Sequence, residues 1–499
     1  MITLPKINFY HSSKRLHLIN YYIFLGFMKT IYNKDHFAKL KSLNERISKN
    51  AEIGGAYFGY LMLYKLGTCK YIDICTSKVF KRDVCLVTGL EQPFEGQYGS
   101  VYGSNEPLPD PTPLMITPEE VSNYDDRPWR PFRWPYHQTM AIFKLDINHW
   151  LDMDKYYMHY IKEKERIRHK YGKQNFDMLP EGYDGCFELM ETVTNHLIAR
   201  YPLLFTVLKD GNYEKGKTGD GKIIRNEITK EILDMTLPLK ESPLVYVSKL
   251  AKEDFYVVKK NPTDGLHYLV GAAVPFPGGS FGIDQKIGHH IDTIHADVPY
   301  YKEKLKKSME RWFDRMKPND PVERASWYIT WDVKLKVNNI YQRPEFKPNL
   351  EAEMKSTDPK EFNVRVERQT LRRLPKSNVI IFTNHPVFYS IEEMKDEPMI
   401  PSLLKKILYE GPEDILKYKN FPLIRDHLAE YLDKLVARQY ELGIINDETP
   451  LKTQPTYPFA YWSKTNFDYV NGWSNPSPSY DKKNMKTDTL KNVKLADNE

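Results

Sequence analysis

Arg365-Val-Glu-Arg-Gln-Thr-Leu-Arg-Arg-Leu-Pro-Lys-Ser377, followed by Asn378 and the run Val379-Ile-Ile-Phe-Thr383, is the stretch that decides the fold. Successive side chains of a β-strand point to opposite faces of the sheet. The pattern therefore predicts one face with Arg365, Glu367 and Gln369 and an opposite face with Val364, Val366 and Arg368. A turn over Leu374 to Asn378 leads into the second run, which is β-branched. The sequence predicts a β-hairpin here.

Further strands and helices flank this hairpin. Three runs are rich in β-branched and aromatic residues and bounded by Gly, Pro or Asn, as strands are; they are Phe255–Val258, His267–Val274 and Trp327–Val333. Apolar residues at helical spacing predict helices over 150–170, 186–200, from Asp297 as N-cap (with Pro299 in the first turn) to Met316, and around 428–442. Strands joined by turns, with helices before, between and after them, predict an α+β domain around a mostly antiparallel sheet.

The ends of the chain differ from its middle. Residues 1–34 contain no Asp or Glu, and their apolar run is shorter than the roughly 20 residues of a membrane helix. A basic, acid-free N-terminus is typical of an organelle-targeting segment, although an uncleaved extension has the same composition. We predict a basic extension over 1–50, a Pro-rich lead-in over 51–120, the main domain over 121–445 and a partly disordered tail over 446–499. From the basic, acid-free N-terminus we expect a cytoplasmic or mitochondrial location.

Composition excludes several classes of protein. The 72 basic residues nearly match the 66 acidic ones, and without a long basic run the sequence does not favour nucleic-acid binding. None of the four cysteines forms a C-x-x-C pair, so we expect neither a zinc ribbon nor an all-cysteine iron–sulfur site. The low cysteine content suits a protein of a reducing compartment. P-loop, nucleophile-elbow and dinucleotide-binding motifs are also missing from the sequence. If the protein performs redox chemistry, its electrons must come from elsewhere.

Lys286-Ile-Gly-His-His-Ile-Asp-Thr-Ile-His295 packs three histidines into seven residues. Imidazole is the commonest metal ligand among side chains, and a single histidine can be the axial ligand of a haem iron. His289, His290 and His295 are all candidates on this basis, but adjacent histidines cannot easily face one metal. The alternative is that all three are surface residues of a loop.

The arginines of the 365–377 stretch are the second candidate site. Forked guanidinium groups bind carboxylates with charge-assisted hydrogen bonds, and haem propionates are such carboxylates. The alternative is an exposed charged strand face. Against it, Arg368 shares its face with two valines, which is not the pattern of a simply solvated arginine.

Four stretches, in order over residues 125 to 400, carry a resemblance to a known family. They are Arg130–Arg133 with Asp146 and Trp150; Lys252–Phe255; Lys286–Gly288 with His295, Pro299 and Pro321–Trp327; and Arg365–Pro375 with Ile381–Thr383. In these stretches the chain resembles the α subunit of haem-dependent oxidative N-demethylase and its broad family, with terminal additions that look fungal. The resemblance implies a PAS-like fold that encloses one haem b in the 121–445 domain. It also implies a separate flavin and iron–sulfur reductase as the source of electrons.

Site residues follow from the resemblance by position. His295 would be the axial ligand of the iron. Lys286, Arg365, Arg368, Arg372 and Arg373 would contact the cofactor, while Glu367 and Arg368 would be catalytic, with Glu367 orienting the arginines or an ammonium group. The chain departs from the bacterial pattern at Asp297, where that pattern tends to have Pro. It departs again at Asn384-His385, where an Ile-Arg-Thr-Tyr-like run is usual, and this puts the specific demethylase reaction in doubt.

Three functions remain open at this point. The first is an O2-dependent, monooxygenase-like oxidative N-demethylation of a small secondary amine such as dimethylamine, or a related haem oxidation. The second is a haem-binding PAS-like sensor or carrier without turnover, although the sequence shows no output module. The third is a scaffold that kept the fold and lost the cofactor.

Overall fold

In the computed structural model the chain divides into two compact units, Met1–Ser100 and Val101–Glu499, and every described residue belongs to the second. The described residues are 108–213, 217–278, 282–337, 347–454 and 456–460. The basic N-terminal extension and most of the predicted tail therefore lie outside them. The domain boundaries at 50, 120 and 445 stay predictions.

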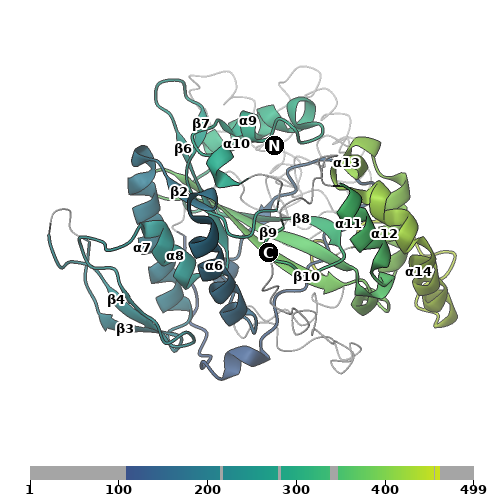
Figure 1. Cartoon of the computed structure of the whole chain (residues 1–499), viewed down its shortest axis with the longest axis horizontal. Helices are drawn as coiled ribbons and strands as arrows, with labels where there is room; N and C mark the ends of the chain where they lie inside the picture. The colour runs from purple at the N-terminus through teal and green to yellow at the C-terminus, as the bar shows by residue number, and fades with distance from the viewer. Residues whose placement is uncertain (1–107, 214–216, 279–281, 338–346, 455, 461–499) are drawn as a thin grey trace, which may run out of the picture. The chain divides into compact units, whose positions relative to one another are not determined.

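A seven-stranded sheet, antiparallel throughout, is the centre of the described part (Figure 1). Its order is β1 (Phe143–Lys144), β8 (Val322–Thr330), β9 (Asn363–Arg373), β10 (Ile380–Ser390), β6 (Asp254–Lys260), β7 (His267–Ala273) and β2 (Phe176–Met178). β9 and β10 pair along their whole lengths, from Ile380 opposite Arg373 to Ser390 opposite Asn363. The predicted hairpin and the α+β class are confirmed.

β10 extends to Ser390, beyond its predicted end at Thr383, although Pro386 lies in its middle. Proline breaks a strand because it cannot donate to the ladder. The carbonyl oxygen of Pro386 accepts a hydrogen bond from the Tyr160 hydroxyl (2.5 Å), so the polar backbone of this residue faces away from β9. Pairing with β6 has already ended at Asn384. The missing N–H therefore removes no ladder hydrogen bond.

The helices surround this sheet. They are α6 (Tyr157–Tyr171), α7 (Tyr183–Arg200), α8 (Pro243–Leu250), α9 (Ile291–Ile294), a π-helical turn (Tyr301–Leu305) that continues into α10 (Lys306–Arg315), α11 (Lys347–Ser356), α12 (Ile400–Glu410), α13 (Glu413–Tyr418) and α14 (Phe421–Glu441). The predicted helices over 186–200 and around 428–442 are confirmed as α7 and α14. The helix predicted from Trp150 begins only at Tyr157, because the Asp154 side chain accepts the Tyr156 N–H (2.9 Å) in a turn.

The predicted start of the helix after the histidines was wrong. Asp297 is exposed and caps nothing, and Pro299 precedes the helical turn. Backbone hydrogen bonds from Val298 to His295 (3.0 Å) and from Tyr301 to Val298 (3.1 Å) form separate turns there. Tyr300 then has a positive φ of 59°, which no helix continues through. The chain therefore becomes helical only at Tyr301.

A second, three-stranded sheet contains β3 (Phe205–Lys209), β4 (Ile223–Asn226) and β5 (Ile232–Asp234), and the sequence had not predicted it. These strands are short and β3 exposes three of its five residues, so the apolar alternation that identifies a strand is weak.

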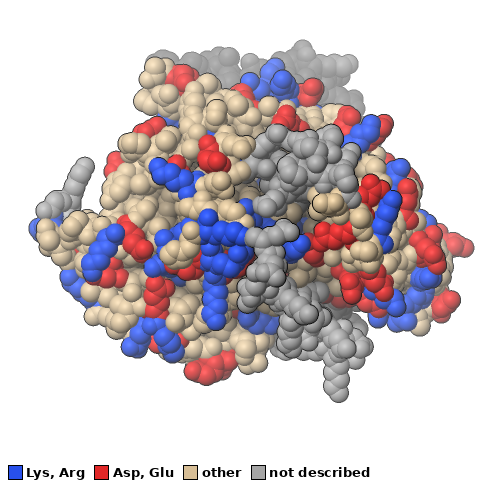
Figure 2. Space-filling view, viewed as in Figure 1, with Lys and Arg blue, Asp and Glu red and all other residues tan. Residues whose placement is uncertain are grey.

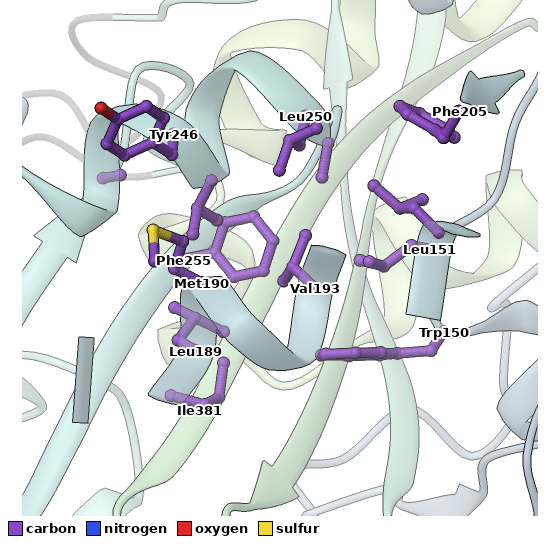
Figure 3. Packing of buried hydrophobic residues seen from close by; sticks show 14 of the residues in the cluster. Trp150, Leu151, Leu189, Met190, Val193, Phe205, Tyr246, Leu250, Phe255 and Ile381 are labelled. Carbon is purple, nitrogen blue, oxygen red and sulfur yellow. The ribbon is translucent and has the colours of Figure 1, made fainter. Parts of the chain in front are cut away.

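Helices cover one face of the seven-stranded sheet with two apolar cores. In the first, Phe255 of β6 lies beside Met190 and Val193 of α7 (Figure 3). In the second, Val364 and Val366 of β9 pack with residues of α12 and α14. The valine face predicted for the hairpin is thus buried.

The Pro-rich segment Arg127–Pro135 lies against the second core. Trp129 and Phe132 are each 1% exposed. Arg130 within it forms a buried ion pair with Glu397 (2.6 Å). The Pro-rich segment is therefore ordered and is not a free linker.

The surface of the described part is charged with both signs. Lys and Arg side chains are interspersed with Asp and Glu over the face shown in Figure 2. Among the described helices, none has the length and apolar character needed to cross a bilayer.

Candidate functional site

A cavity of about 330 Å³ lies between the other face of the seven-stranded sheet and the segment that carries α9 and α10. This volume is in the range of small-molecule sites. The lining residues alternate along β9 (Glu367, Gln369, Leu371) and β10 (Ile380, Phe382, Asn384), and β8 contributes residues 324–328. The face predicted to carry Glu367 and Gln369 is therefore the cavity face.

The cavity has an apolar part and a polar part. Leu371 and Phe382, paired across β9 and β10, cluster with Trp312 of α10. The neighbouring row is polar, because Gln369 pairs with Arg324 on one side and with Asn384 on the other. A ligand that fits this cavity needs a large apolar body and polar groups along one edge.

His295 lines the cavity at the C-terminal end of α9. Its ring Nδ1 lies 2.8 Å from the backbone carbonyl oxygen of Ile291. A carbonyl can only accept, so Nδ1 carries the proton and Nε2 keeps the lone pair that binds a metal. Burial, with smaller contributions from Lys286 and Arg324, lowers the pKa of His295 below its usual value. The imidazole is therefore held neutral, in the tautomer that leaves Nε2 available.

Neighbouring side chains fix the orientation of this imidazole. The Tyr301 ring stacks on His295, with ring centroids 5.3 Å apart and planes 18° apart. The Tyr301 hydroxyl donates to Asp292 (2.6 Å), which also forms an ion pair with Lys306. Contacts between residues of α9, the π-helical turn and α10 thus fix the orientation of the His295 ring.

The other two histidines of the stretch do not line the cavity. His289 is exposed, and His290 packs on the Tyr268 ring with centroids 5.5 Å apart. Of the three histidines, only His295 lines the cavity. Lys286 of the same stretch also lines it.

Glu367 is the one carboxylate among the described residues that line the cavity. Arg365 Nε donates to its Oε1 (2.5 Å), and the Asn384 amide donates to its Oε2. Arg365 is fully buried and also donates to the carbonyl oxygens of Lys334 and Leu335. Glu367 is therefore a rigid carboxylate with an arginine directly behind it.

Four cationic side chains line the same cavity: Arg133, Lys286, Arg324 and Lys419. Burial lowers the pKa of Arg324, and the charge of Arg133 lowers it further. Burial and the charges of Arg324 and Arg133 lower the pKa of Lys419 to about 7. Arg133, Arg324 and Lys419 are thus close enough to repel one another.

The structure does not bring Arg368 or Arg372 to the cavity, because both share the valine face of β9. Arg368 forms ion pairs with Asp152 (3.2 Å) and Glu323 (3.6 Å). Burial alone would raise the pKa of Asp152, but Arg368, His149 and Arg127 together hold it well below its usual range. The Arg372 guanidinium stacks over the Trp150 ring, 4.4 Å from its centroid. Their contacts are those of residues that stabilise the fold.

Arg373 also has other partners. It donates to the backbone carbonyl oxygens of Met316 (2.9 Å), Phe313 and Asn378 (2.9 Å). Met316 is the C-cap of α10. Arg373 therefore satisfies carbonyls at the end of this helix and ties it to the hairpin turn.

Sequence reasoning missed Arg324, Arg133 and Lys419 as site residues. Arg133 and Arg324 lie within stretches that carried the family resemblance, and their positive charge in otherwise buried segments was the available signal. Lys419 follows α13 in a short connection that has no distinguishing pattern.

A family model described as haem-dependent oxidative N-demethylase, alpha subunit-like, matches residues 141–429, which is more than half of the chain. The chain belongs to this family. The matched span includes Lys286, His295, Arg324 and Glu367, whereas Arg133 lies just before it. Of the two departures from the bacterial pattern, Asp297 is outside the cavity lining and Asn384 is within it.

The lining residues fit the haem that the family description implies. His295 offers a neutral imidazole with Nε2 available, the apolar part of the cavity suits a macrocycle, and the cations suit its carboxylates. No group of three or more His, Cys, Asp or Glu side chains within the described residues is arranged to hold a metal ion. A haem iron needs no such group, because the porphyrin supplies four of its ligands.

Proposed function

We propose that this protein, with a haem b ligated by His295, removes a methyl group oxidatively from a small secondary amine such as dimethylamine. O2 is the oxidant, and a separate flavin and iron–sulfur reductase supplies the electrons. The overall change consumes one O2, two electrons and two protons, and yields the shortened amine, formaldehyde and water. The observation that carries the proposal is the neutral His295 imidazole at the wall of a mostly apolar cavity.

Haem would supply the activation of O2 and the oxidation of the methyl group. The chain supplies ligation through His295 and orientation of the ligand through the stacked Tyr301 ring. Glu367 is the proposed partner of the substrate ammonium group, because a carboxylate in a partly apolar cavity attracts a small cation strongly. The apolar side chains of Leu371, Phe382 and Trp312 would exclude water from the reacting groups.

The test compares absorption spectra of the wild type with those of His295→Ala, His289→Ala and His290→Ala after expression with added haem. The Soret band should disappear in the first variant and persist in the other two, which serve as matched controls. Formaldehyde release from dimethylamine with a chemical reductant or a reductase then tests turnover. A Soret band that survives in His295→Ala contradicts the assignment of the ligand.

A second candidate function is haem binding without turnover, as in a sensor or carrier. The observation that favours it is the compensation of Glu367 by Arg365 and Asn384, which leaves less charge for an ammonium group. Asn384 also stands where the family resemblance predicts an Arg-containing run. A protein with a normal Soret band that releases no formaldehyde from any small amine tested would have this function.

Two finer points belong to the same proposal. The arrangement of an antiparallel sheet with a ligand cavity on one face is consistent with a PAS-like domain. A cytoplasmic or mitochondrial location is the proposal that the basic N-terminus motivates, and residues 1–34 lie outside the described part.

A further inference from the structure

Arg324 is a half-buried arginine at the cavity wall, with no carboxylate partner among the described residues. No carboxylate of the described residues forms an ion pair with it, and its buried Nε donates no hydrogen bond there. A buried guanidinium ordinarily has a carboxylate or several carbonyl groups around it, since removing a charge from water is costly. Arg365 shows what a satisfied arginine on the same sheet face looks like, with Glu367 and two carbonyl oxygens as acceptors.

Two more cations line the same cavity, and their hydrogen-bond partners among the described residues are neutral. Arg133 donates to the Thr139 hydroxyl (2.6 Å) and the His137 carbonyl (2.9 Å). Lys419 donates to the Trp327 carbonyl (2.6 Å) and is 7% exposed. Neither forms an ion pair with a carboxylate of the described chain. Arg133 and Arg324 are half-buried and Lys419 is buried, so water screens their repulsion only in part, and an anion between them would stabilise all three.

The charge of the cavity leads to the same conclusion. Its described lining has four cations and one carboxylate, and that carboxylate is already paired with Arg365. The polar row that includes Arg324 borders the apolar part of the cavity. An apolar body with carboxylates at its edge would match both features.

We propose that Arg324, Arg133 and Lys419 form a carboxylate-binding subsite of the cavity, which in the haem-loaded protein holds the propionate groups. The identity of the carboxylates rests on the proposed function, whereas the subsite itself rests on the unpaired cations. This assignment replaces Arg368 and Arg372, which lie on the opposite face of the sheet, and Arg373, which donates to carbonyl oxygens at the end of α10. A small acidic substrate is the other source of a carboxylate, and the experiment separates the two.

The first measurement needs no haem. In the haem-free protein Arg324→Met removes a half-buried charge that no carboxylate of the described residues offsets, so its melting temperature should rise by a few degrees. Arg365→Met is the matched control, at a paired arginine on the same face, and its melting temperature should fall. Glutarate, a small dicarboxylate, should raise the melting temperature of the wild type and not that of Arg324→Met. If Arg324→Met melts lower and responds to glutarate as the wild type does, the subsite is refuted.

The second measurement identifies the carboxylate. Haem and haem dimethyl ester, which lacks free propionates, are titrated into wild type, Arg324→Met and Arg324→Lys. The wild type should prefer haem at least about tenfold, Arg324→Met should lose this preference, and Arg324→Lys should retain part of it. If the preference instead survives in Arg324→Met while the spectral response to N-methylglycine is lost, the carboxylate belongs to an acidic substrate. If neither changes, the subsite is refuted.

The outcomes also separate this subsite from the proposed activity. A wild type that binds haem through Arg324 but releases no formaldehyde refutes the demethylase function and supports the subsite. If the wild type binds no haem, the effect of glutarate on the melting temperatures of wild type and Arg324→Met decides whether the subsite exists.

Discussion

The Nδ1 atom of His295 lies 2.8 Å from the carbonyl oxygen of Ile291, one helical turn earlier. This hydrogen bond comes from the backbone, so it depends on the local fold of α9 and not on a second side chain. It assigns the proton to Nδ1 and leaves the lone pair of Nε2 available. If His295 is the iron ligand, as proposed, the short helix α9 holds the imidazole in the required tautomer before haem is bound.

The Tyr301 ring should matter more to haem binding than its hydroxyl. Tyr301→Leu removes the ring stacked on His295, frees the imidazole to rotate, and should weaken haem affinity about tenfold. Tyr301→Phe keeps the ring and loses only the hydrogen bond to Asp292, so its loss should be smaller. Titration of haem into the three proteins, followed at the Soret band, measures the difference. Equal losses in the two variants would show that the hydroxyl, not the stacking, orients the ring.

Much of the fold could be predicted from the sequence because its central strands are long and alternate clearly. The hairpin of β9 and β10 and the helices α7 and α14 have strong patterns. β1 and β2 have two and three residues, and only pairing with β8 and β7 makes them strands. Local patterns do not contain such tertiary pairings.

His295 and Glu367, where chemistry and spacing both point to a residue, do line the cavity, while their roles stay predictions. The arginines show the limit of this reasoning. Arg368 and Arg372 have the same parity as Val366, so strand alternation already separates them from Glu367. Arg324 lies on another strand, and its place beside Gln369 depends on the order of strands in the sheet. That order is a property of the folded chain.

Loss of the Glu367 charge should impair use of the amine and spare haem binding. Glu367→Gln should lower kcat/KM for dimethylamine by about 10- to 100-fold, because a hydrogen bond to a charged group contributes about 1.5–3 kcal/mol. Asn384→Ala is the matched control, since it removes the donor to Glu367 and keeps the charge. Steady-state formaldehyde release measures both, and an unchanged Soret band shows that haem is bound. A larger loss in Asn384→Ala than in Glu367→Gln would argue against Glu367 as the amine partner.

Arg368 should contribute to the stability of the fold and not to haem binding. Arg368→Met leaves Asp152 and Glu323 without this partner in the core, and should reduce the free energy of unfolding by about 3–5 kcal/mol. Urea denaturation measures this loss, and haem titration of the folded variant should give the wild-type affinity. A variant of wild-type stability with strongly weakened haem binding would restore Arg368 to the site.

Asp126 should make the protein less stable as the pH rises from about 4 to 7. Burial and the charge of Asp154 raise the pKa of Asp126 to about 7, from 3.8 in the unfolded chain. In this window the folded protein keeps a proton that the unfolded chain has lost, so the stabilisation is complete below pH 4 and lost above pH 7. The difference is at most about 4 kcal/mol. Asp126→Asn should not show this loss of stability at high pH. The free energies of unfolding of the wild type and the variant, measured at pH 5 and pH 8, separate the effect of Asp126 from that of other carboxyl groups.

Gly278 should be required for the position of the Glu367 carboxylate. A Cβ at residue 278 would lie 3.0 Å from Glu367 Cδ and 3.1 Å from its Oε1, so Gly278→Ala must displace a carboxylate that Arg365 and Asn384 hold in place. We expect a stability loss of about 1–3 kcal/mol and a roughly tenfold fall in kcat/KM, with the Soret band retained. If the methyl group acts through Glu367, its effect on kcat/KM should largely vanish in the Glu367→Gln background. A double-mutant cycle measures this coupling, and strictly additive losses would mean that Gly278 affects the cavity by another route.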